Sequence, residues 1–480
     1  MEHLHGTIRQ TRAARNIRVF AIAYDAAGHY ADAKVILSVM KGLIFTYALT
    51  YGGAIASFIN PFYGLLVYVC FAIIRPEFLW YWSLSSGGNF SRIIAIALLM
   101  GWAVHGFGKW NLGRSKSILF CLFGFWVWSL LSALVVASNK SVAFGFVEEL
   151  AKILLPFVAG LTLIDSEKKL KQLAWVILLS QSYLAFEMNQ TYLTAFNPLQ
   201  TPWGTGGFGG MDNNCVAIAM VTGAGMAFFM GMHERGWRKW LAFGGAALMT
   251  HVVLFSFSRG GMVGLILMGS VSFWLIDKRP RHVALFGLAA IAGLIMAGPE
   301  VRDEFMSSFA DAEQRDYSSQ SRIDMWSDCL DAMQNHPVLG TGPNHWPVIA
   351  ASYGWPPGKE AHTLWLQIGA ELGIVGLGLL LGFYMTTAFR LYPYAKRKVA
   401  QASEWEVLVA RMTIAALAGF MVSAQFVSLE GLELPYYIML VSAGTLKVAG
   451  SQRRQSVQWV LVRRRWDGPM QTVRSPLSSS

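Results

Sequence analysis

The stretch PNHWPVIAASYGWPPGKEAHTLWLQIGAELGIVG, residues 343–376, decides how the rest of the chain is interpreted. It begins as a polar segment punctuated by Trp and Pro and passes through Lys359 and Glu360 to His362. It then stays apolar as far as Phe389, with Glu371 as its single charged residue. A charged loop that runs directly into an apolar segment of this length predicts a membrane helix entered from water. We therefore expect His362 to lie at the membrane surface.

The composition indicates a membrane protein with several crossings. Hydrophobic residues make up 54% of the 480 residues and charged residues only 14%, whereas soluble domains contain about 25% charged residues. There are 39 Lys and Arg against 28 Asp and Glu, a formal net charge of +11. In a membrane protein such an excess marks cytoplasmic loops, so we expect no nucleic-acid partner. The four cysteines show no spacing typical of a disulfide or a zinc site.

Apolar segments of about membrane length follow one another along the chain. We therefore expect an all-α polytopic membrane protein. Its predicted spans are Leu43–Ile74, Ile93–Phe107, Ile118–Ala137, Phe146–Ile164, Leu173–Met188, Asn214–Met232, Trp240–Phe257, Met262–Ile276, Val283–Ala297, His362–Phe389, Val407–Val427 and Tyr436–Val448. The first span is broken by Asn60 and Pro61, so it forms either one kinked crossing or a tight hairpin.

Basic loops alternate with weakly charged loops from Lys109 onward, and the basic set is expected to be cytoplasmic. The basic clusters lie at residues 109–116, 168–171, 235–239, 278–281 and 390–398, and after 453. The segment 298–361 is then external. If the basic N-terminus is also cytoplasmic, the first span is one net crossing and the crossings number about twelve.

These patterns divide the chain into five parts. They are an N-terminal cytoplasmic segment, in part vector-derived or a mis-assigned start (1–41), a transmembrane bundle (42–297), a large external loop (298–361), C-terminal transmembrane helices (362–449) and a basic cytoplasmic tail expected to be disordered (450–480). The large loop precedes the third-last span and is partly helical, because apolar residues recur at helical spacing from Ser321 until Pro337 stops the helix. Another external loop, 189–213, is rich in glycine and lets backbone amides approach a ligand.

His362 is the main candidate for a catalytic residue. Near neutral pH an imidazole can take a proton from a hydroxyl and pass it on. The alternative is an interfacial histidine that only helps to cap the helix that starts at Thr363. His336 and His345 lie in the same loop and are weaker candidates.

A few arginines on the external side can contact an anionic substrate. Arg259 lies in the tight turn FSRGG, whose glycines hold it close to the bundle; the alternative is an arginine that snorkels to the lipid headgroups. Arg322 begins the loop helix and shares a helical face with Trp326; the alternative is a solvated surface residue. Arg75 and Arg92 flank the first external loop and form either a salt-bridged rim or part of a ligand site.

Charged residues also occur inside the predicted spans. Lys152 follows Glu148 and Glu149 at helical spacing. A charged group inside a membrane is costly, so each of these residues is expected to have an ion-pair partner or a function. An ion pair that joins helices and a role in substrate binding remain equally open. The same two alternatives hold for Glu371.

Arginines that face a histidine at the membrane surface suit a lipid-linked diphosphate as substrate. Guanidinium groups bind phosphate oxygens in a bidentate manner. If the diphosphate is the leaving group, the arginines neutralise the charge that develops on it, while the histidine activates an incoming hydroxyl. The external segments contain no DxD motif, and we expect no paired carboxylates to lie together on the external side, so we expect neither a metal ion nor a cofactor.

Several short motifs occur together in one order. They are DNN (212–214), FSRGG (257–261), SRIDMW (321–326), PVLGTG (337–342), HTL (362–364) and ELGIVG (371–376). This ordered set resembles the O-antigen ligase/polymerase superfamily, over roughly residues 42 to 448. The early region 61–102 is also similar to ligases associated with exopolysaccharide and exosortase loci.

The resemblance implies a GT-C-like bundle of about twelve helices with a large periplasmic loop, in a metal-independent glycosyltransferase of the bacterial inner membrane. It implies that His362 is catalytic and that Arg259 and Arg322 contact the diphosphate. The supporting residues expected around them are Arg75, Arg92, Asn213, Trp326 and Glu371.

Members of the superfamily take a glycan from undecaprenyl diphosphate. The expected reaction is that of an O-antigen ligase, with a lipid A-core sugar hydroxyl as acceptor and membrane lipids as surroundings. An O-antigen or exopolysaccharide polymerase and a protein O-oligosaccharyltransferase are the alternatives within the superfamily. A transporter of lipid-linked glycans is the alternative from another class. Transporters carry polar residues and broken helices near mid-membrane, whereas the unmatched charges here gather at one face.

Overall fold

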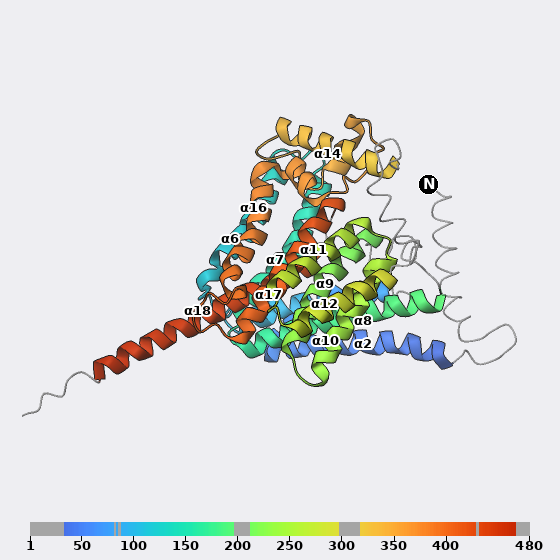
Figure 1. Ribbon diagram of the computed structural model, residues 1–480. Helices are drawn as coiled ribbons and strands as arrows, with labels where there is room; N and C mark the ends of the chain where they lie inside the picture. The colour runs from blue at the N-terminus through green and yellow to red at the C-terminus, as the bar shows by residue number, and fades with distance from the viewer. Residues whose placement is uncertain are drawn as a thin grey trace, which may run out of the picture.

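The computed structural model describes residues 33–80, 83–84, 88–195, 212–296, 317–428 and 432–466, and every regular element within these ranges is a helix (Figure 1). The first half contains α2 (Ala33–Ile59), α3 (Pro61–Ile74), α4 (Pro76–Leu79), α5 (Phe90–Val104), α6 (Lys116–Val135), α7 (Lys140–Leu163), α8 (Glu167–Ala195) and α9 (Asn213–His233). The second half contains α10 (Trp237–Phe255), α11 (Arg259–Leu275), α12 (Pro280–Met296), α14 (Tyr317–Asn335), α15 (Trp346–Ile349), α16 (Leu364–Ala395), α17 (Glu404–Ser423) and α18 (Leu434–Trp466).

The helical bundle fits a polytopic membrane protein, as the sequence predicts. Six helical segments of the described chain are long and apolar enough to cross a membrane. They are Met40–Ile59, Pro61–Leu79, Gly113–Val135, Asn213–His233, Leu364–Ala395 and Glu404–Phe426. The total of about twelve crossings and the limits of the five parts of the chain stay predictions. Most of the glycine-rich loop and residues 297–316 of the large loop lie outside the described residues.

The first predicted span is a hairpin of two antiparallel helices and not one kinked crossing. A Cβ at Gly53 of α2 would touch Val67 of α3, and one at Gly64 would touch Ser57, so later residues of α3 pair with earlier residues of α2. Asn60 forms the turn, where its side chain accepts a hydrogen bond from the Phe62 N–H. The inference of one net crossing is therefore wrong, because Pro61 starts a new helix at its first position, where no backbone donor is needed.

The ends of this hairpin can be placed against α8. Lys41, near the start of α2, forms an ion pair with Glu187 near the end of α8 at 2.6 Å. The turn lies at the other end of α8, where the Lys169 ammonium is 5.4 Å from the centre of the Phe62 ring. The start of α2 is thus at the end of the bundle opposite to the basic first turn of α8, which contains Lys169.

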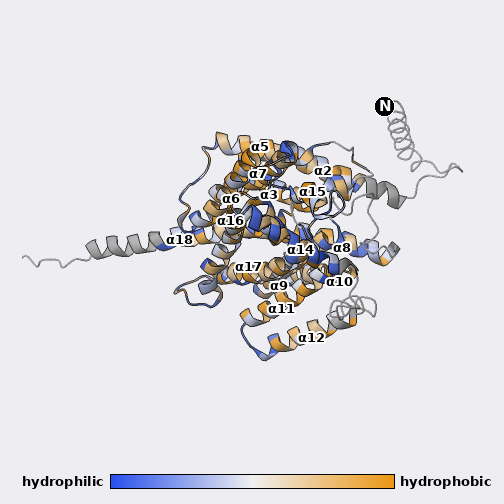
Figure 2. Ribbon diagram, turned by 90° about the horizontal axis from the view of Figure 1, so that it is seen from above, coloured by the Kyte–Doolittle hydropathy of each residue, from blue (hydrophilic) through white to orange (hydrophobic). Residues whose placement is uncertain are grey.

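Helix α9 forms the centre of the bundle. Nearly all its residues from Val216 to Gly231 are buried, and it packs against α10, α11 and α17. Small residues permit this close packing: a Cβ at Gly225 would lie 3.2 Å from Met268 and 3.3 Å from the Ala416 backbone nitrogen. Seen from above, the hydrophilic helix α14 lies across the middle of this apolar bundle (Figure 2).

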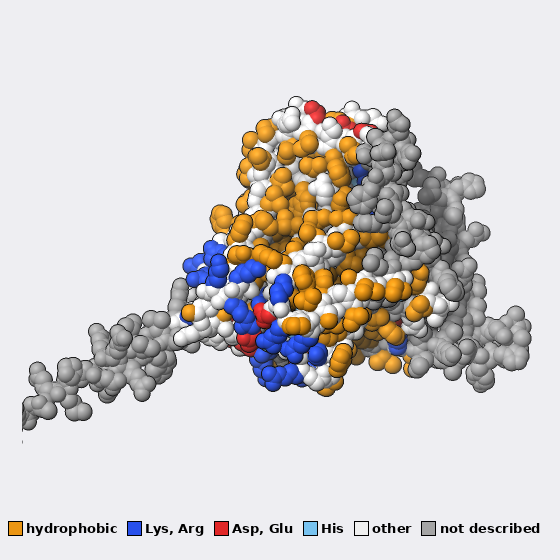
Figure 3. All heavy atoms as spheres, in the orientation of Figure 1, with side chains coloured by type: hydrophobic (Ala, Val, Ile, Leu, Met, Phe, Trp, Pro, Cys, Tyr) orange, Lys and Arg blue, Asp and Glu red, His pale blue; other side chains and the backbone are white. Residues whose placement is uncertain are grey.

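The two ends of the molecule differ in charge. On the face shown in Figure 3, Lys and Arg side chains gather near the lower end with a few acidic side chains among them, whereas acidic side chains lie at the upper end around α14. At the basic end the Lys447 Nζ of α18 donates to the carbonyl oxygens of Lys109, Leu161 and Thr162 at 3.0, 2.6 and 3.2 Å. A lysine in this position satisfies carbonyl groups at the end of α7 that have no partner within their own helix.

The motifs at 337–342 and 371–376 pack against each other. Helix α16 is interrupted at Gly373, which has a φ of 67°, and the interruption frees backbone groups that would otherwise bond within the helix. The Ile374 N–H donates to the Pro337 carbonyl at 2.9 Å, while the Gly342 N–H donates to the Glu371 carbonyl at 2.9 Å. A side chain on Gly373 would overlap the Val338 carbonyl, so the close contact requires glycine at this position.

Candidate active site

His362 lies in a strained turn immediately before α16. Its φ is 51°, in the left-handed region that non-glycine residues seldom adopt. The Thr363 side chain caps the helix by accepting a hydrogen bond from the Leu366 N–H at 3.5 Å, so the capping role belongs to Thr363 and not to the imidazole. Backbone strain of this kind costs about 1–3 kcal/mol and persists only where surrounding contacts impose it.

A chain of hydrogen bonds fixes the turn. The His362 N–H donates to the Ser428 Oγ at 3.1 Å, and that hydroxyl donates to the Gln367 Oε1 at 2.5 Å. The Gln367 Nε2 in turn donates to the Glu371 Oε1 at 3.0 Å. Sequence reasoning missed Ser428, because nothing in the local pattern after α17 indicates a partner so far away in the chain.

Glu371 joins this chain to the large loop. It is fully buried and accepts hydrogen bonds from the backbone N–H groups of Asn344 and Trp346, both at 2.9 Å. Its carboxylate therefore holds the loop against α16 one turn below the Gln367 amide. This placement supports the interpretation of Glu371 as a supporting residue that positions the site.

The positive charges of Arg322 and Lys359 act on the imidazole of His362. Burial, and after it the positive charges of Arg322 and Lys359, lower the pKa of His362 from 6.5 to about 4, although the charge of Asp212 acts in the opposite direction. The side chain is half-buried and therefore still open to a substrate. His362 is neutral at pH 7, the state in which an imidazole can accept a proton.

Arg322 and Trp326 both lie on α14, as the sequence predicts. The helix ends at Asn335, and its residues Met325, Cys329 and Ala332 are fully buried at helical spacing. The Trp326 ring packs against Phe426 with 6.1 Å between the ring centres. Phe426 precedes Ser428 by two residues, so the tryptophan fixes α14 over the segment that holds His362.

Arg259 is the first residue of α11 and lies beside the same segment. The Ser258 side chain caps this helix by accepting from the Gly261 N–H at 3.1 Å. A Cβ at Gly260 would lie 2.8 Å from the Phe426 Cβ, and the Ser423 Oγ donates to the Gly260 carbonyl at 3.1 Å. The glycines of the FSRGG turn therefore allow the start of α11 to approach the end of α17. This agrees with the prediction that they hold Arg259 close to the bundle.

The residues at the start of α9 have different roles. The Asn213 Nδ2 donates to the Ser256 carbonyl at 2.8 Å, which joins α9 to the end of α10. Asp212 caps α9 by accepting from the Cys215 N–H at 2.7 Å, and its charge acts on both His362 and Glu360. Asp212 was missed although the DNN motif contains it.

Two further expectations are corrected by the geometry. The idea that no carboxylates come together on this face is wrong, because the fold brings Asp212 and Glu360 within electrostatic reach of each other. No group of three or more His, Cys, Asp or Glu that could hold a metal ion is present in the described ranges. The other expectation concerns His345, which is fully buried: its Nε2 accepts from the Asn139 N–H at 3.0 Å and its Nδ1 donates to the Pro343 carbonyl at 2.9 Å. With both ring nitrogens bonded to backbone, His345 is structural.

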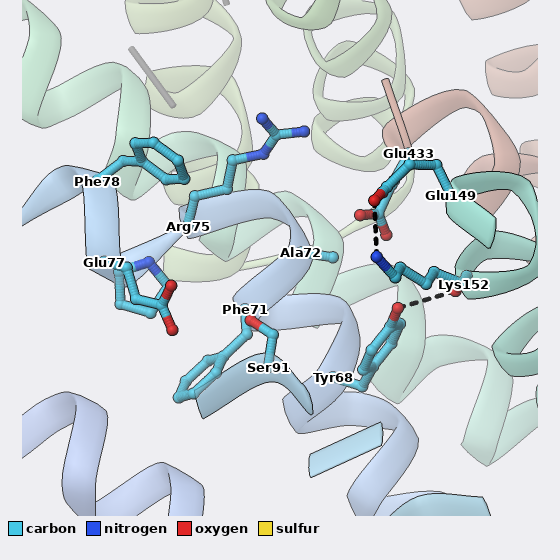
Figure 4. Close-up of a pocket in the computed structure, with 11 residues that line it drawn as sticks. Tyr68, Phe71, Ala72, Arg75, Glu77, Phe78, Ser91, Glu149, Lys152 and Glu433 are labelled. Carbon is cyan, nitrogen blue, oxygen red and sulfur yellow. Dashed lines mark hydrogen bonds and ion pairs between the residues drawn. The ribbon is translucent and has the colours of Figure 1, made fainter. Parts of the chain in front are cut away.

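Arg75 and Arg92 do not join the residues around His362. Arg75 lies between α3 and α4 with a φ of 49° and lines a separate cavity with Glu149, Lys152 and Glu433 (Figure 4). Arg92, near the start of α5, acts electrostatically on Glu148 of α7. The structure thus divides the predicted residues between two places.

Two comparisons show which known proteins the chain is similar to. The model of a family described as O-antigen ligase matches residues 244–381, which include Arg259, Arg322, His362 and Glu371. An O-antigen ligase of Pseudomonas aeruginosa is 29% identical to the chain over 263 residues. This match spans 53% of the chain and 60% of the length of that relative. Over the region that contains these residues, the chain is therefore similar to O-antigen ligases.

Proposed function

We propose that the chain is an O-antigen ligase that transfers a glycan from undecaprenyl diphosphate to a sugar hydroxyl of lipid A-core at the periplasmic face of the inner membrane. The observation that carries this proposal is the strained turn that presents a neutral His362 beside Arg322, within the region matched by the O-antigen ligase family. Neutral imidazole and fixed cations are the two groups that this transfer needs.

The proposed reaction is a single displacement at the anomeric carbon of the donor glycan. The acceptor hydroxyl gives its proton to the His362 imidazole while its oxygen forms the new bond to the anomeric carbon. The bond from that carbon to the diphosphate oxygen breaks, and the electron pair leaves with undecaprenyl diphosphate. Arg259 and Arg322 bind the diphosphate and neutralise the charge that it gains. No metal ion is part of this proposal, so transfer is expected to continue in the presence of a chelator.

The interruption of α16 does not favour the transporter alternative. A broken helix in a transporter lines a cavity that holds the substrate. The break at Gly373 is covered by backbone of the segment 337–342, which bonds to the freed groups. The break therefore serves to attach the large loop to the bundle.

A deletion strain tests the proposal and separates the alternatives. We expect its lipopolysaccharide to lose long-chain glycan while lipid-linked polymer accumulates, and the wild-type gene, but not one with His362→Ala, to restore the chains. Lipid-linked glycan reduced to single repeat units would instead identify a polymerase. Unchanged lipopolysaccharide together with loss of glycan from proteins would identify a protein oligosaccharyltransferase.

A further inference from the structure

A polar cavity separate from the residues around His362 lies between α3, α5, α7 and the start of α18. Its volume is about 460 Å³, within the range of sites that bind small molecules. Arg75 comes from the junction of α3 and α4, and the side chains of Lys152, Glu149 and Glu433 lie together across from it (Figure 4). None of these residues belongs to the hydrogen-bond chain that holds His362.

The charges of α7 show that the cavity opens to water. Glu149 and Lys152 form an ion pair at 2.6 Å, yet their side chains remain 63% and 41% exposed. Glu148 pairs with the same lysine at 3.0 Å and is 66% exposed. Glu149 follows the helix start at Lys140 by roughly 14 Å along the helix axis, given a rise of about 1.5 Å per residue. Charges exposed to lipid at that depth would cost on the order of 3 kcal/mol each, so these side chains must face an aqueous space.

The mixed chemistry of the lining favours a neutral polyhydroxyl ligand. A diphosphate would meet three carboxylates, those of Glu77, Glu149 and Glu433, which repel an anion. Sugar hydroxyls both donate and accept, so they can bond to carboxylates and to cations at the same time. The half-exposed ring of Phe78 offers an apolar surface to the C–H face of a pyranose. Tyr68 is fixed beside Lys152, because its hydroxyl donates to the Lys152 carbonyl at 2.8 Å.

The cavity lies at the same end of the bundle as His362. Helix α7 starts beside the large loop, since the Asn139 N–H donates to the His345 Nε2 at 3.0 Å. On the other side, Glu433 follows Ser428 after the short connection between α17 and α18. The rings of Trp365, Tyr384 and Tyr436 then bridge from the start of α16 to the start of α18, with 6.2 Å between each pair of neighbouring centres.

From this arrangement we infer that the cavity is an oligosaccharide subsite that holds the inner sugars of the acceptor while its terminal hydroxyl reaches His362. This inference rests on the proposed ligase reaction for the identity of the acceptor. The ion pair within α7 then has a substrate-binding role. A subsite separate from the arginines of α11 and α14 would let donor and acceptor bind at the same time.

Binding of a lipid-free core oligosaccharide to the full chain in nanodiscs tests the subsite directly. By calorimetry we expect Glu149→Gln to weaken binding at least tenfold, because its ion pair with Lys152 and one of its two acceptor oxygens are lost. Ser91→Trp, which fills the cavity from α5 without touching the ion pair, should do the same. The control is Glu404→Gln, which removes a carboxylate paired with Arg397 at 2.7 Å outside the cavity and should leave binding unchanged. Equal affinity of the wild type and both cavity variants, or no binding by the wild type, would overturn the inference.

Steady-state transfer separates this inference from the proposed reaction. In Glu149→Gln the KM for lipid A-core is expected to rise at least tenfold, while the KM for the lipid-linked donor changes less than twofold. A rise in the donor KM alone would assign the cavity to the donor and contradict the acceptor subsite. If the wild type binds the oligosaccharide but transfers no glycan to lipid A-core, the ligase reaction fails while the subsite stands.

Discussion

The backbone N–H of His362 donates to the Ser428 Oγ at 3.1 Å, although the whole of α16 and α17 separates the two residues in the chain. The same hydroxyl donates to Gln367, so one serine connects the turn before α16 to the interior of that helix. The end of α17 thereby sets the position of the imidazole. A mutation remote from the imidazole in sequence should consequently alter the chemistry.

Removal of the Ser428 hydroxyl should slow transfer without unfolding the protein. A net loss of about 1 kcal/mol in Ser428→Ala corresponds to a decrease in kcat of about fivefold, with donor KM unchanged. Ser428→Thr keeps the hydroxyl and should restore most of the rate. Ser352→Ala is the matched control, since that hydroxyl donates to a backbone carbonyl on the exposed surface of the loop. A Ser428→Ala protein with wild-type kcat would show that the bond does not position His362.

The pH profile distinguishes the two roles open to His362. With a pKa of about 4 in the free protein, a general base stays neutral as the pH falls through 6.5, so kcat/KM should remain level to about pH 5 and then decrease. Bound diphosphate raises the pKa, so kcat should begin to fall at a higher pH than kcat/KM does.

A hydrogen-bond donor to phosphate would give the opposite profile, because its contribution grows on protonation. We expect His362→Ala to lose about 10²–10⁴-fold in rate with donor binding largely intact. Loss of donor binding in this variant, with an unchanged pH profile of the residual activity, would assign the imidazole to the diphosphate.

Arg259 and Arg322 are predicted to act through their charge and their planar shape. Arg259→Ala and Arg322→Ala should abolish most transfer while the protein still inserts, and lysine at either position should recover only part of it, because a point charge does not reproduce the two-pronged contact. Arg238→Ala, at the exposed start of α10, serves as the control. Transfer and donor binding are measured together, and near-normal transfer in either alanine variant would reassign that arginine to headgroup or surface contacts.

Gly373 and Gly378 lie in the same helix and should respond oppositely to alanine. At Gly373 the φ of 67° and the overlap with Val338 should destabilise the fold by at least about 2 kcal/mol. At Gly378 a Cβ meets nothing within 4 Å, so alanine should be neutral or stabilise by up to about 1 kcal/mol. Thermal unfolding in detergent measures both variants. Equal melting temperatures would contradict the interruption of α16.

The orientation of the chain rests on the alternating basic loops and can be measured by thiol labelling. A cysteine at Ser352, on the exposed loop, should react with an impermeant reagent from the periplasm. A cysteine at Lys169, in the basic first turn of α8, should react only after the membrane is permeabilised. The native cysteines are replaced beforehand, and that background protein provides the blank. Labelling at Lys169 alone would reverse the orientation and move the site to the cytoplasm.

The sequence by itself determined the helical membrane fold, the amphipathic helix α14, the tight turn at Arg259 and the position of His362 before α16. These features are local. In a bilayer a helix satisfies all backbone hydrogen bonds within one segment, and the hydrophobic periodicity, glycine and proline of that segment mark the faces and ends of the helix. The same local signals named Glu371 as a supporting residue, since an isolated charge in an apolar helix needs a partner.

Only the tertiary structure decided which distant segments meet. It made Asn60 the turn of a hairpin, used both nitrogens of His345 for backbone contacts and gave Ser428 its role. It also separated Arg75 and Arg92 from His362, although all three had been expected near one site. A local pattern shows that a group needs a partner, but the identity of the partner depends on how the helices pack. The packing also decides the burial and the neighbouring charges that lower the pKa of His362 to about 4.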